Sequence, residues 1–285
     1  MTGAFGDLSA AATAAATARD LARARGRELL AAPPWAGLED RVTLVVTAPA
    51  AGIEGAPPAL ALWLAIDAGA ARALPTEYQP LIAHEVLVQR QRATASTPAI
   101  VVTVTTDTAV ERLLQSLTPR ALEARWQWRH ADVVIDRLRR AEQFALRAGM
   151  LPEDGPERIL RPLWGAAHAA ARALDTLTGE RRRDALAAAG EVEAALARIA
   201  CAIDEGAYPP ADLLVPIARE TRIGRRIGPW LDDLVPALAG DEAATRRILG
   251  SREQALAEVE AVLAERFRGR PWLADPESFA LRTPR

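Results

Sequence analysis

Residues 45–67 read VVTAPAAGIEGAPPALALWLAID and contain two apolar runs separated by a segment rich in Gly and Pro. Runs of this length and composition, bounded by turn residues, predict strand, loop and strand. The loop has the length of a phosphate-binding turn, yet it carries almost no reactive side chain. In the second run, alternate residues point to opposite faces of a strand. One face carries Leu60, Leu62, Leu64 and Ile66, and the other carries Ala59, Ala61, Trp63 and Ala65.

The apolar runs that flank this stretch indicate the fold class. We expect four strands, in the segments RVTLVVTA (41–48), PALALWLAID (58–67), LIAHEVLVQRQ (81–91) and PAIVVTVTT (98–106). A helix over 9–30 precedes them, Asp107 caps another over 108–117, and only helical periods follow Ala121. Strands in the first third and helices afterwards predict an α+β protein with a small mixed or antiparallel sheet. The expected domains are 1–118, α+β, and 119–285, all-helical.

The composition excludes several classes of chemistry. The chain has 285 residues, 50% hydrophobic, and a formal net charge of -2, so no global field attracts nucleic acid or an anionic membrane. All 35 basic residues are Arg, which excludes a Schiff-base or P-loop lysine. Cys201 is the single cysteine, which excludes an intrachain disulfide and a thiolate metal cluster.

The same survey gives an expected location. The N-terminal segment carries Asp and Arg throughout and lacks the apolar core of a signal peptide. No apolar run reaches the length that spans a bilayer. We therefore expect a cytoplasmic protein without a membrane partner. The excess of Ala and Arg is typical of GC-rich actinobacterial coding bias.

The opening stretch resembles the nucleotidyltransferase superfamily of the polymerase beta type, and the spacing fits without a gap. The family's Gly-Ser turn falls on Thr47 and Ala48, its Arg falls on Ala51, and Gly52 is retained. The family's two metal-binding aspartates fall on Ala59 and Ala61. Its third carboxylate falls within residues 99–104, which contain no acid. A hairpin in an unrelated α+β domain is the alternative interpretation.

The resemblance implies that ordinary nucleotidyl transfer is lost. That reaction needs two divalent ions held by hard oxygen ligands, and alanine offers only methyl groups. Pro49 in the turn has no amide hydrogen for a phosphate. We therefore expect no metal site and no cofactor. An active nucleotidyltransferase with a different alignment is a further hypothesis.

Residues 125–137, RWQWRHADVVIDR, resemble the helix after the catalytic domain of bacterial aminoglycoside-type nucleotidyltransferases. In that family the helix lies beside the cleft, which makes Arg129 and His130 candidate ligand-binding residues. Helical spacing of three and four also predicts a ladder of ion pairs on one face, formed by Arg129, Asp132, Asp136 and Arg140.

Two other groups are candidates for ligand binding. Trp63 lies on the strand face where the carboxylates project in the family, and it could support a ring or an apolar tail. The alternative is core packing. In RETRIGRRIGPW, several guanidinium groups could converge on one oxyanion, and we name Arg222, Arg225 and Arg226. The alternative is a charged turn paired with Glu220, Asp232 and Asp233.

A general base in a metal-free cleft would come from the polar residues near the second and third strands. The candidates are Glu85, which could handle a proton, with His84 and Tyr78. The three histidines have no spacing that predicts a metal site.

The sequence therefore leads to two functional hypotheses of different class. The first is a repurposed, metal-independent enzyme of specialised metabolism that positions a small anionic metabolite bearing phosphate, sulfate or carboxylate. The second is a catalytically inactive pseudoenzyme that binds or scaffolds a protein partner or companion chain.

Overall fold

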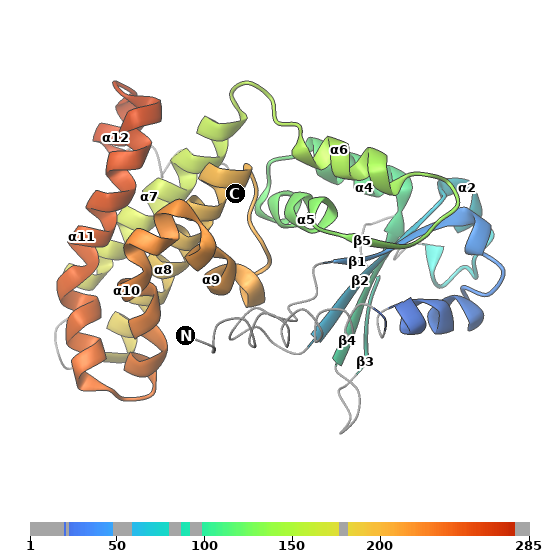
Figure 1. Ribbon diagram of the computed structural model, residues 1–285, viewed down its shortest axis with the longest axis horizontal. Helices are drawn as coiled ribbons and strands as arrows, with labels where there is room; N and C mark the ends of the chain where they lie inside the picture. The colour runs from blue at the N-terminus through green and yellow to red at the C-terminus, as the bar shows by residue number, and fades with distance from the viewer. Residues whose placement is uncertain are drawn as a thin grey trace, which may run out of the picture. The chain divides into compact units, whose positions relative to one another are not determined.

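The computed structural model describes residues 20, 23–47, 59–79, 87–91, 99–176 and 182–276. The chain divides into two compact units, Met1–Met150 and Leu151–Arg285 (Figure 1). The first unit is α+β and the second is helical, as the sequence predicts. The boundary expected at residue 118 falls inside the first unit, because two more helices and a strand of that unit follow it.

The first unit is built on a five-stranded sheet with the order β3-β4-β2-β1-β5. Strands β2 and β4 pair in parallel, and the β1–β2, β1–β5 and β3–β4 pairs are antiparallel, so the sheet is mixed. The strands are β1 (Val42–Thr47), β2 (Ala59–Ile66), β3 (Leu87–Gln91), β4 (Ala99–Thr106) and β5 (Asp132–Asp136). The first four lie within the segments that the sequence predicts.

One face of the sheet packs on the N-terminal part of the chain. Leu62, Leu64 and Ile66 of β2 are buried there with Leu30, from a helical segment over 23–31, and with Trp35. Ala70 and Ala71 of the short helix α2 (Ala68–Ala71) belong to the same cluster, and the short element η1 (Glu39–Arg41) directly precedes β1. The alternation of large side chains in β2 therefore serves to fill a core.

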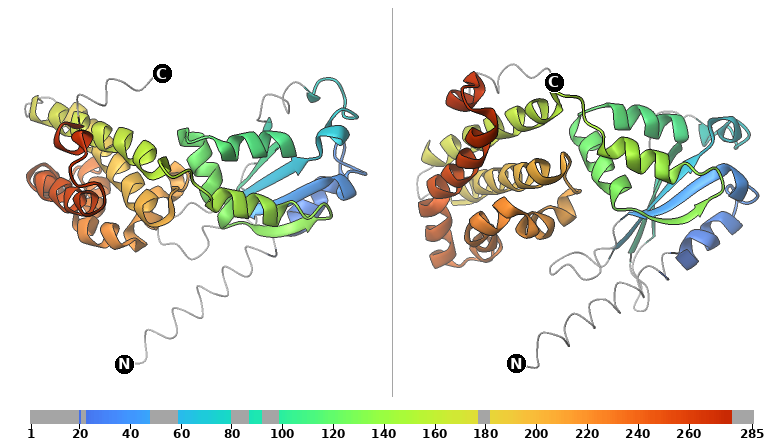
Figure 2. Two further views of the ribbon diagram at one scale, coloured as in Figure 1. Left: turned by 90° about the horizontal axis from the view of Figure 1, so that it is seen from above. Right: turned by 45° about the horizontal axis from the view of Figure 1, so that its top comes forward.

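Three helices cover the opposite face of the sheet (Figure 2). They are α4 (Asp107–Gln115), α5 (Pro119–Arg129) and α6 (Ala141–Gly149). Trp63 of β2 meets Trp128 of α5 edge to face at 5.9 Å between ring centroids, and Trp128 meets Phe144 of α6 at 4.9 Å. This aromatic series joins the sheet to two helices, and edge-to-face pairs of this kind add stability beyond the area they bury.

The prediction of a helix through residues 125–137 is wrong in its second half. Helix α5 ends at Arg129, His130 caps it, and residues 132–136 form β5, which pairs with β1. The β-branched run Val133, Val134 and Ile135 favours an extended chain, and pairing with β1 adds main-chain hydrogen bonds. The expected ladder requires residues 129–140 to share one helix face, and they do not, because α5 ends at Arg129.

Arg125 of α5 is buried and interacts with main-chain carbonyl groups. Its guanidinium donates to Ser116 O at 3.4 Å and to Leu114 O, both at the C-terminal end of α4. It also donates to the carbonyl oxygens at the end of α6, those of Arg147 (3.3 Å), Ala148 (3.1 Å) and Met150 (2.8 Å). The last carbonyls of a helix have no partner within the helix and carry partial negative charge. One cation thus caps the ends of two helices.

The second unit is helical throughout its described part (Figure 1). Its helices are α7 (Gly155–Thr176), α8 (Arg182–Glu205), α9 (Ala211–Glu220), α10 (Arg222–Leu238), α11 (Glu242–Phe267) and α12 (Pro271–Ala274). Helix α7 packs on α8, and α10 packs on α11, where Trp230 donates its indole N–H to Ile248 O at 3.1 Å. Among the described helices of the chain, none is both long and apolar enough to cross a membrane.

The turn between α9 and α10 requires glycine at residue 224. A Cβ built on Gly224 would lie 1.6 Å from the carbonyl oxygen of Ala218, so no other residue fits. The Thr221 hydroxyl accepts from Gly224 N at 2.8 Å and donates to Ala218 O at 2.6 Å. Thr221 therefore closes α9 and caps α10 with one side chain.

The helical unit buries a carboxyl group, that of Glu193 on α8. The residue is 8% exposed, and burial raises the pKa of Glu193 from 4.5 to about 7, although the charge of Arg219 lowers it in part. Arg219 itself pairs with Asp232. Removal from water therefore outweighs attraction to the guanidinium.

We predict that replacing Arg125 with Met lowers the free energy of unfolding by about 3 kcal/mol or more, because buried carbonyls lose charged donors. Arg125→Lys should recover part of this loss, since an ammonium has fewer donors. Urea unfolding followed by near-UV circular dichroism measures the effect, with the exposed Arg137→Ala as control. A Met variant as stable as the parent would contradict the proposed role.

We also predict that the stability of the helical unit falls as pH rises towards and through 7. The folded state keeps the Glu193 proton up to about pH 7, whereas the unfolded chain releases it near pH 4.5. The stability that depends on this proton is therefore fully present below pH 4.5 and is lost as the pH rises through 7. The shift corresponds to about 3 kcal/mol. Urea midpoints between pH 4 and 8 should decline more steeply for the parent than for Glu193→Gln. Parallel declines would refute this assignment.

Candidate functional site

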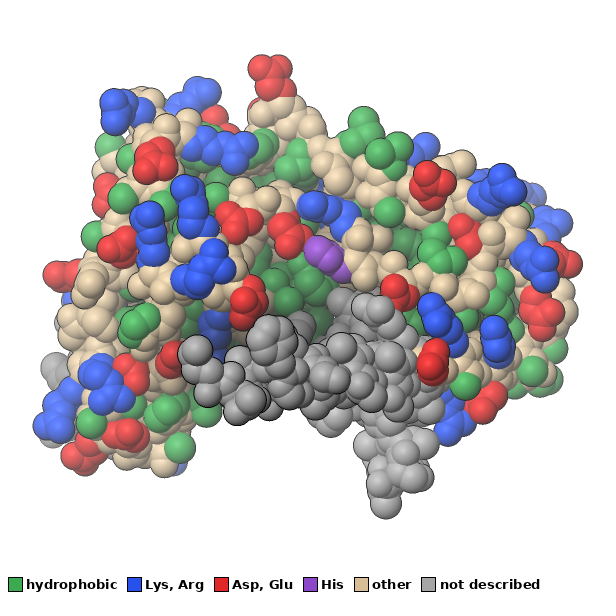
Figure 3. Space-filling view, viewed as in Figure 1, with side chains coloured by type: hydrophobic (Ala, Val, Ile, Leu, Met, Phe, Trp, Pro, Cys, Tyr) green, Lys and Arg blue, Asp and Glu red, His purple; other side chains and the backbone are tan. Residues whose placement is uncertain are grey.

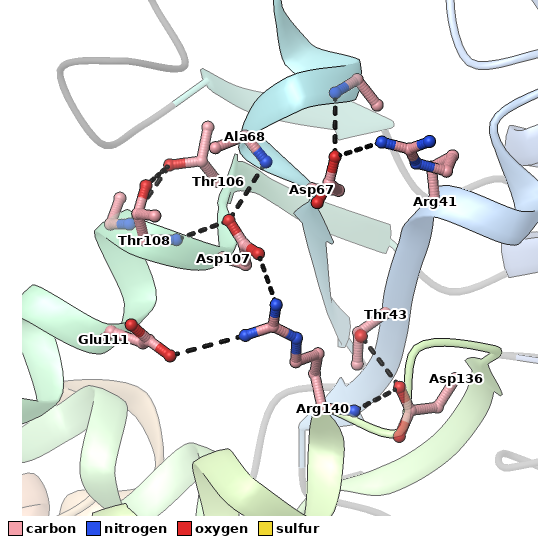
Figure 4. Close-up of polar contacts among 12 residues, drawn as sticks. Arg41, Thr43, Asp67, Ala68, Thr106, Asp107, Thr108, Glu111, Asp136 and Arg140 are labelled. Carbon is pink, nitrogen blue, oxygen red and sulfur yellow. Dashed lines mark hydrogen bonds and ion pairs between the residues drawn. The ribbon is translucent and has the colours of Figure 1, made fainter.

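Polar side chains gather where β2 and β4 end (Figure 4). The two strands run parallel in register, with Ile66 opposite Thr106, so their carboxyl ends meet at one edge of the sheet. Asp67 follows β2, and Asp107 follows β4 as the first residue of α4. In open sheets, ligands bind outside the carboxyl ends of the strands. This edge is therefore the place to look for a site in the described part of the unit.

Asp67 organises the turn after β2. Its carboxylate accepts from Ala70 N at 3.0 Å, as the N-cap of α2, and from the Arg41 guanidinium at 2.6 Å. The hydrogen bond from Arg41 and that from Ala70 N hold the pKa of Asp67 below its ordinary value. The group is thus ionised and committed to two donors.

Asp107 ties the ends of the two parallel strands together. It is 5% exposed, and its Oδ1 accepts from Ala68 N at 3.1 Å and from Thr108 N at 2.7 Å. Its Oδ2 lies 3.5 Å from Arg140, whose guanidinium also lies 3.6 Å from Glu111. The sequence predicts Asp107 as the N-cap of α4, and this is wrong by one residue. The N-cap is Thr106, whose hydroxyl accepts from Ala109 N at 3.2 Å.

Asp136, at the end of β5, is the third carboxylate described at this edge of the sheet, after Asp67 and Asp107. It accepts from the Thr43 hydroxyl at 2.9 Å, from Arg140 N at 2.8 Å and from Ala141 N at 2.9 Å, so it caps α6. Each of these carboxylates has donors of its own. Within the residues that the structure describes, no group of three or more His, Cys, Asp or Glu side chains could hold a metal ion.

A cavity of about 290 Å³ opens beside this framework. Thr106 and Thr108 contribute hydroxyl groups that lie 3.1 Å apart, and Gln79 donates from its side chain to Leu74 O at 2.7 Å. Arg72 and Arg112 lie at the rim and are exposed. The lining consists of Ala68, Ala71, Arg72, Gln79, Thr106, Thr108 and Arg112. Two guanidinium groups and two hydroxyl groups suit an oxyanion.

The cleft that the resemblance implies lies at the opposite end of β2. Ala61 is opposite Thr47 at the end of β1, and the turn over 48–58 lies outside the described residues. The distance along β2 from Ala61 to Asp67 is about 20 Å. The structure thus places the polar edge and the expected metal positions at different ends of one strand.

The sequence candidates near that cleft divide into described and undescribed residues. His84 and Glu85 lie outside the described part of the chain. Trp63 is 6% exposed in the core, as the alternative interpretation proposes. Tyr78 is half-buried and meets Trp35 edge to face at 5.8 Å.

Arg129 and His130 are exposed at the end of α5, next to the start of β5. The His130 ring stacks on Trp126 at 4.7 Å between centroids. Asp132 is opposite Val46 at the end of β1, so this turn lies at the same end of the sheet as the expected cleft.

The three candidate arginines of the helical unit interact with different partners. Arg225 donates to Glu220 O at 2.6 Å, and Arg226 lies 3.7 Å from Glu258. Arg222 lines a separate cavity. The nearby Arg219 pairs with Asp232. Of the acids that the charged-turn interpretation names, Asp232 pairs with Arg219, and Glu220 accepts from Arg225 through its main-chain carbonyl.

Sequence reasoning did not identify Arg72 and Arg112 as site residues. The available signal was an Asp directly after each of two apolar runs, at residues 67 and 107. Recognising that these runs are parallel neighbours would have brought both ends together.

No protein-family model matches the sequence, and no curated protein matches it. Among solved structures, the chain is similar to a nucleotidyltransferase-like protein from Exiguobacterium sibiricum 255-15, with a TM-score of 0.39 and 16% identity. The alignment covers 89% of this chain and 82% of that one. This similarity is too weak to assign a site or an activity.

We predict that Asp107→Ala lowers the free energy of unfolding by about 2 kcal/mol, because two part-buried amides lose their acceptor. Asp107→Asn keeps an oxygen acceptor and should lose only about half as much. Thermal unfolding distinguishes the two, with the exposed Asp40→Asn as control. Equal losses in both variants would show that the charge, not the acceptor, is what matters.

Proposed function

We propose that the protein binds a small anionic metabolite, bearing phosphate, sulfate or carboxylate, in the cavity at the carboxyl ends of β2 and β4. The observation that supports this is the presence of Arg72 and Arg112 around one cavity with Thr106 and Thr108. Arginine presents a planar fork of donors that matches the geometry of an oxyanion. Alanines at residues 68 and 71 leave room for the ligand.

The charges around the cavity favour an incoming anion. Within the described residues, neither Arg72 nor Arg112 forms an ion pair, whereas Arg140 and Arg147 lie within ion-pair distance of Glu111. A guanidinium without a carboxylate partner is available to a ligand. Amides at the start of α4, at the same place, already donate to Asp107 and Thr106, so the positive charge at the cavity comes from the two arginines.

We further propose that binding needs no divalent ion. Alanines occupy residues 59 and 61, where the nucleotidyltransferase resemblance implies two metal-binding aspartates. The carboxylates at the other end of β2 accept hydrogen bonds from Arg41 and from main-chain amides. The protein would then be a repurposed member of a nucleotidyltransferase-like fold, active in specialised metabolism.

Isothermal titration with inorganic phosphate, sulfate and citrate, in the presence of a chelator, tests this proposal. We expect binding by the parent, and about tenfold or greater weakening in Arg72→Gln and in Arg112→Gln, because each removes a charge-assisted hydrogen bond. Arg137→Gln, which is exposed at the end of β5, is the matched control.

Two outcomes would overturn the proposal. One is that none of these anions binds, or that both cavity variants bind as the parent does. The other is that ATP binds only with magnesium, which would show that the alignment of Ala59 and Ala61 is wrong.

A further inference from the structure

The helical unit contains a cavity of about 430 Å³ whose floor is apolar. Val262, Leu263 and Phe267 of α11 form the floor together with Ile203 of α8. The first three are buried, with 4%, 0% and 9% exposure. Such a surface takes an aliphatic or aromatic side chain.

Two arginines lie at the rim of this cavity. Arg222 is the first residue of α10, and Arg266 belongs to the last turn of α11. Within the described part of the chain, neither forms an ion pair, and the Arg266 guanidinium lies 5.6 Å from the centre of the Phe267 ring. Arg247 and Arg270, in the same unit, do lie within ion-pair distance of carboxylates.

Two acids share the rim, namely Asp204 and Glu265. Asp204 accepts from Arg222 N at 3.2 Å, and Glu265 is exposed. The formal charge around the cavity is therefore balanced. Basic and acidic side chains are likewise interspersed over the face of this unit that Figure 3 shows. A balanced rim discriminates against a dianion and favours a ligand that carries both signs.

We propose that this cavity binds an α-amino acid with an apolar side chain. The carboxylate of the ligand pairs with Arg222 and Arg266, its ammonium group donates to Asp204 or Glu265, and its side chain packs on the floor. Each part of the ligand thus meets side chains of matching chemistry around one cavity. This site is separate from the proposed anion site in the first unit and does not depend on it.

The neighbouring cavity, of about 510 Å³, shares Arg266 and Phe267 but does not offer the same combination. Glu157 there accepts from the Trp272 indole at 3.0 Å and lies 3.5 Å from Arg270. Acids at the start of α7 also stabilise that helix end. Glu157 and Arg270 of this second cavity therefore already have structural roles.

Isothermal titration of the full chain with L-phenylalanine tests the proposal. L-phenylalaninamide, which lacks the carboxylate, and N-acetyl-L-phenylalanine, which lacks the ammonium group, should each bind about tenfold or more weakly. Arg222→Gln and Arg266→Gln should weaken binding of phenylalanine by a similar factor. Arg246→Gln, an exposed change on the same helix as Arg266, should leave it unchanged.

The result that would overturn the proposal is no heat with phenylalanine at millimolar concentration, or equal binding of phenylalanine and its two derivatives. Weakening by Arg246→Gln equal to that by Arg266→Gln would also overturn it. Phenylalanine binding should be unaffected by Arg112→Gln, which tests the other site. Failure of one proposal is thereby distinguished from failure of the other.

Discussion

The arrangement of the first unit depends on the buried guanidinium of Arg125. It reaches the terminal carbonyls of α4 and α6 from a position between them on α5. Burial lowers the pKa of Arg125 from its ordinary value, yet the group stays charged because that value is so high. Its five N–H donors suit a site with several carbonyls and no carboxylate. This one side chain therefore links all three helices that cover the sheet.

That fixed layer holds the polar edge of the sheet in place. Helix α4 begins with Asp107, and α6 begins just after Asp136 and Arg140, so both helix starts carry residues of the edge. The C-terminal ends of the same two helices are joined through Arg125. Both ends of each helix are therefore tied to other parts of the unit, which stabilises the polar edge. Arg112 of the proposed anion site belongs to α4, so the same support holds that side of the site.

The sequence predicts the four apolar strands and the helical remainder because composition and period are local signals. It fails at β5, because β-branched Val133, Val134 and Ile135 follow a helix directly, and pairing with β1 decides their conformation. The sequence allowed two positions for Trp63, in the core or in a ligand-binding cleft. It did not decide between them, because alternation along one strand does not show which face is buried. The cavity at Arg72 and Arg112 could not be predicted, because it depends on β2 and β4 being parallel neighbours across a long connection.

Strand β5 also covers an edge of the sheet that could otherwise pair with another chain. Without it, β1 would be an edge strand of buried valines and leucine, which is a template for pairing with another chain. β5 covers that edge with a strand of five residues that carries an Asp at each end, and the pairing contains a register irregularity between Leu44 and Val45. Short length, terminal charge and irregular register all oppose the addition of a further strand. Strand β5 thus protects this edge of the sheet against pairing with another chain.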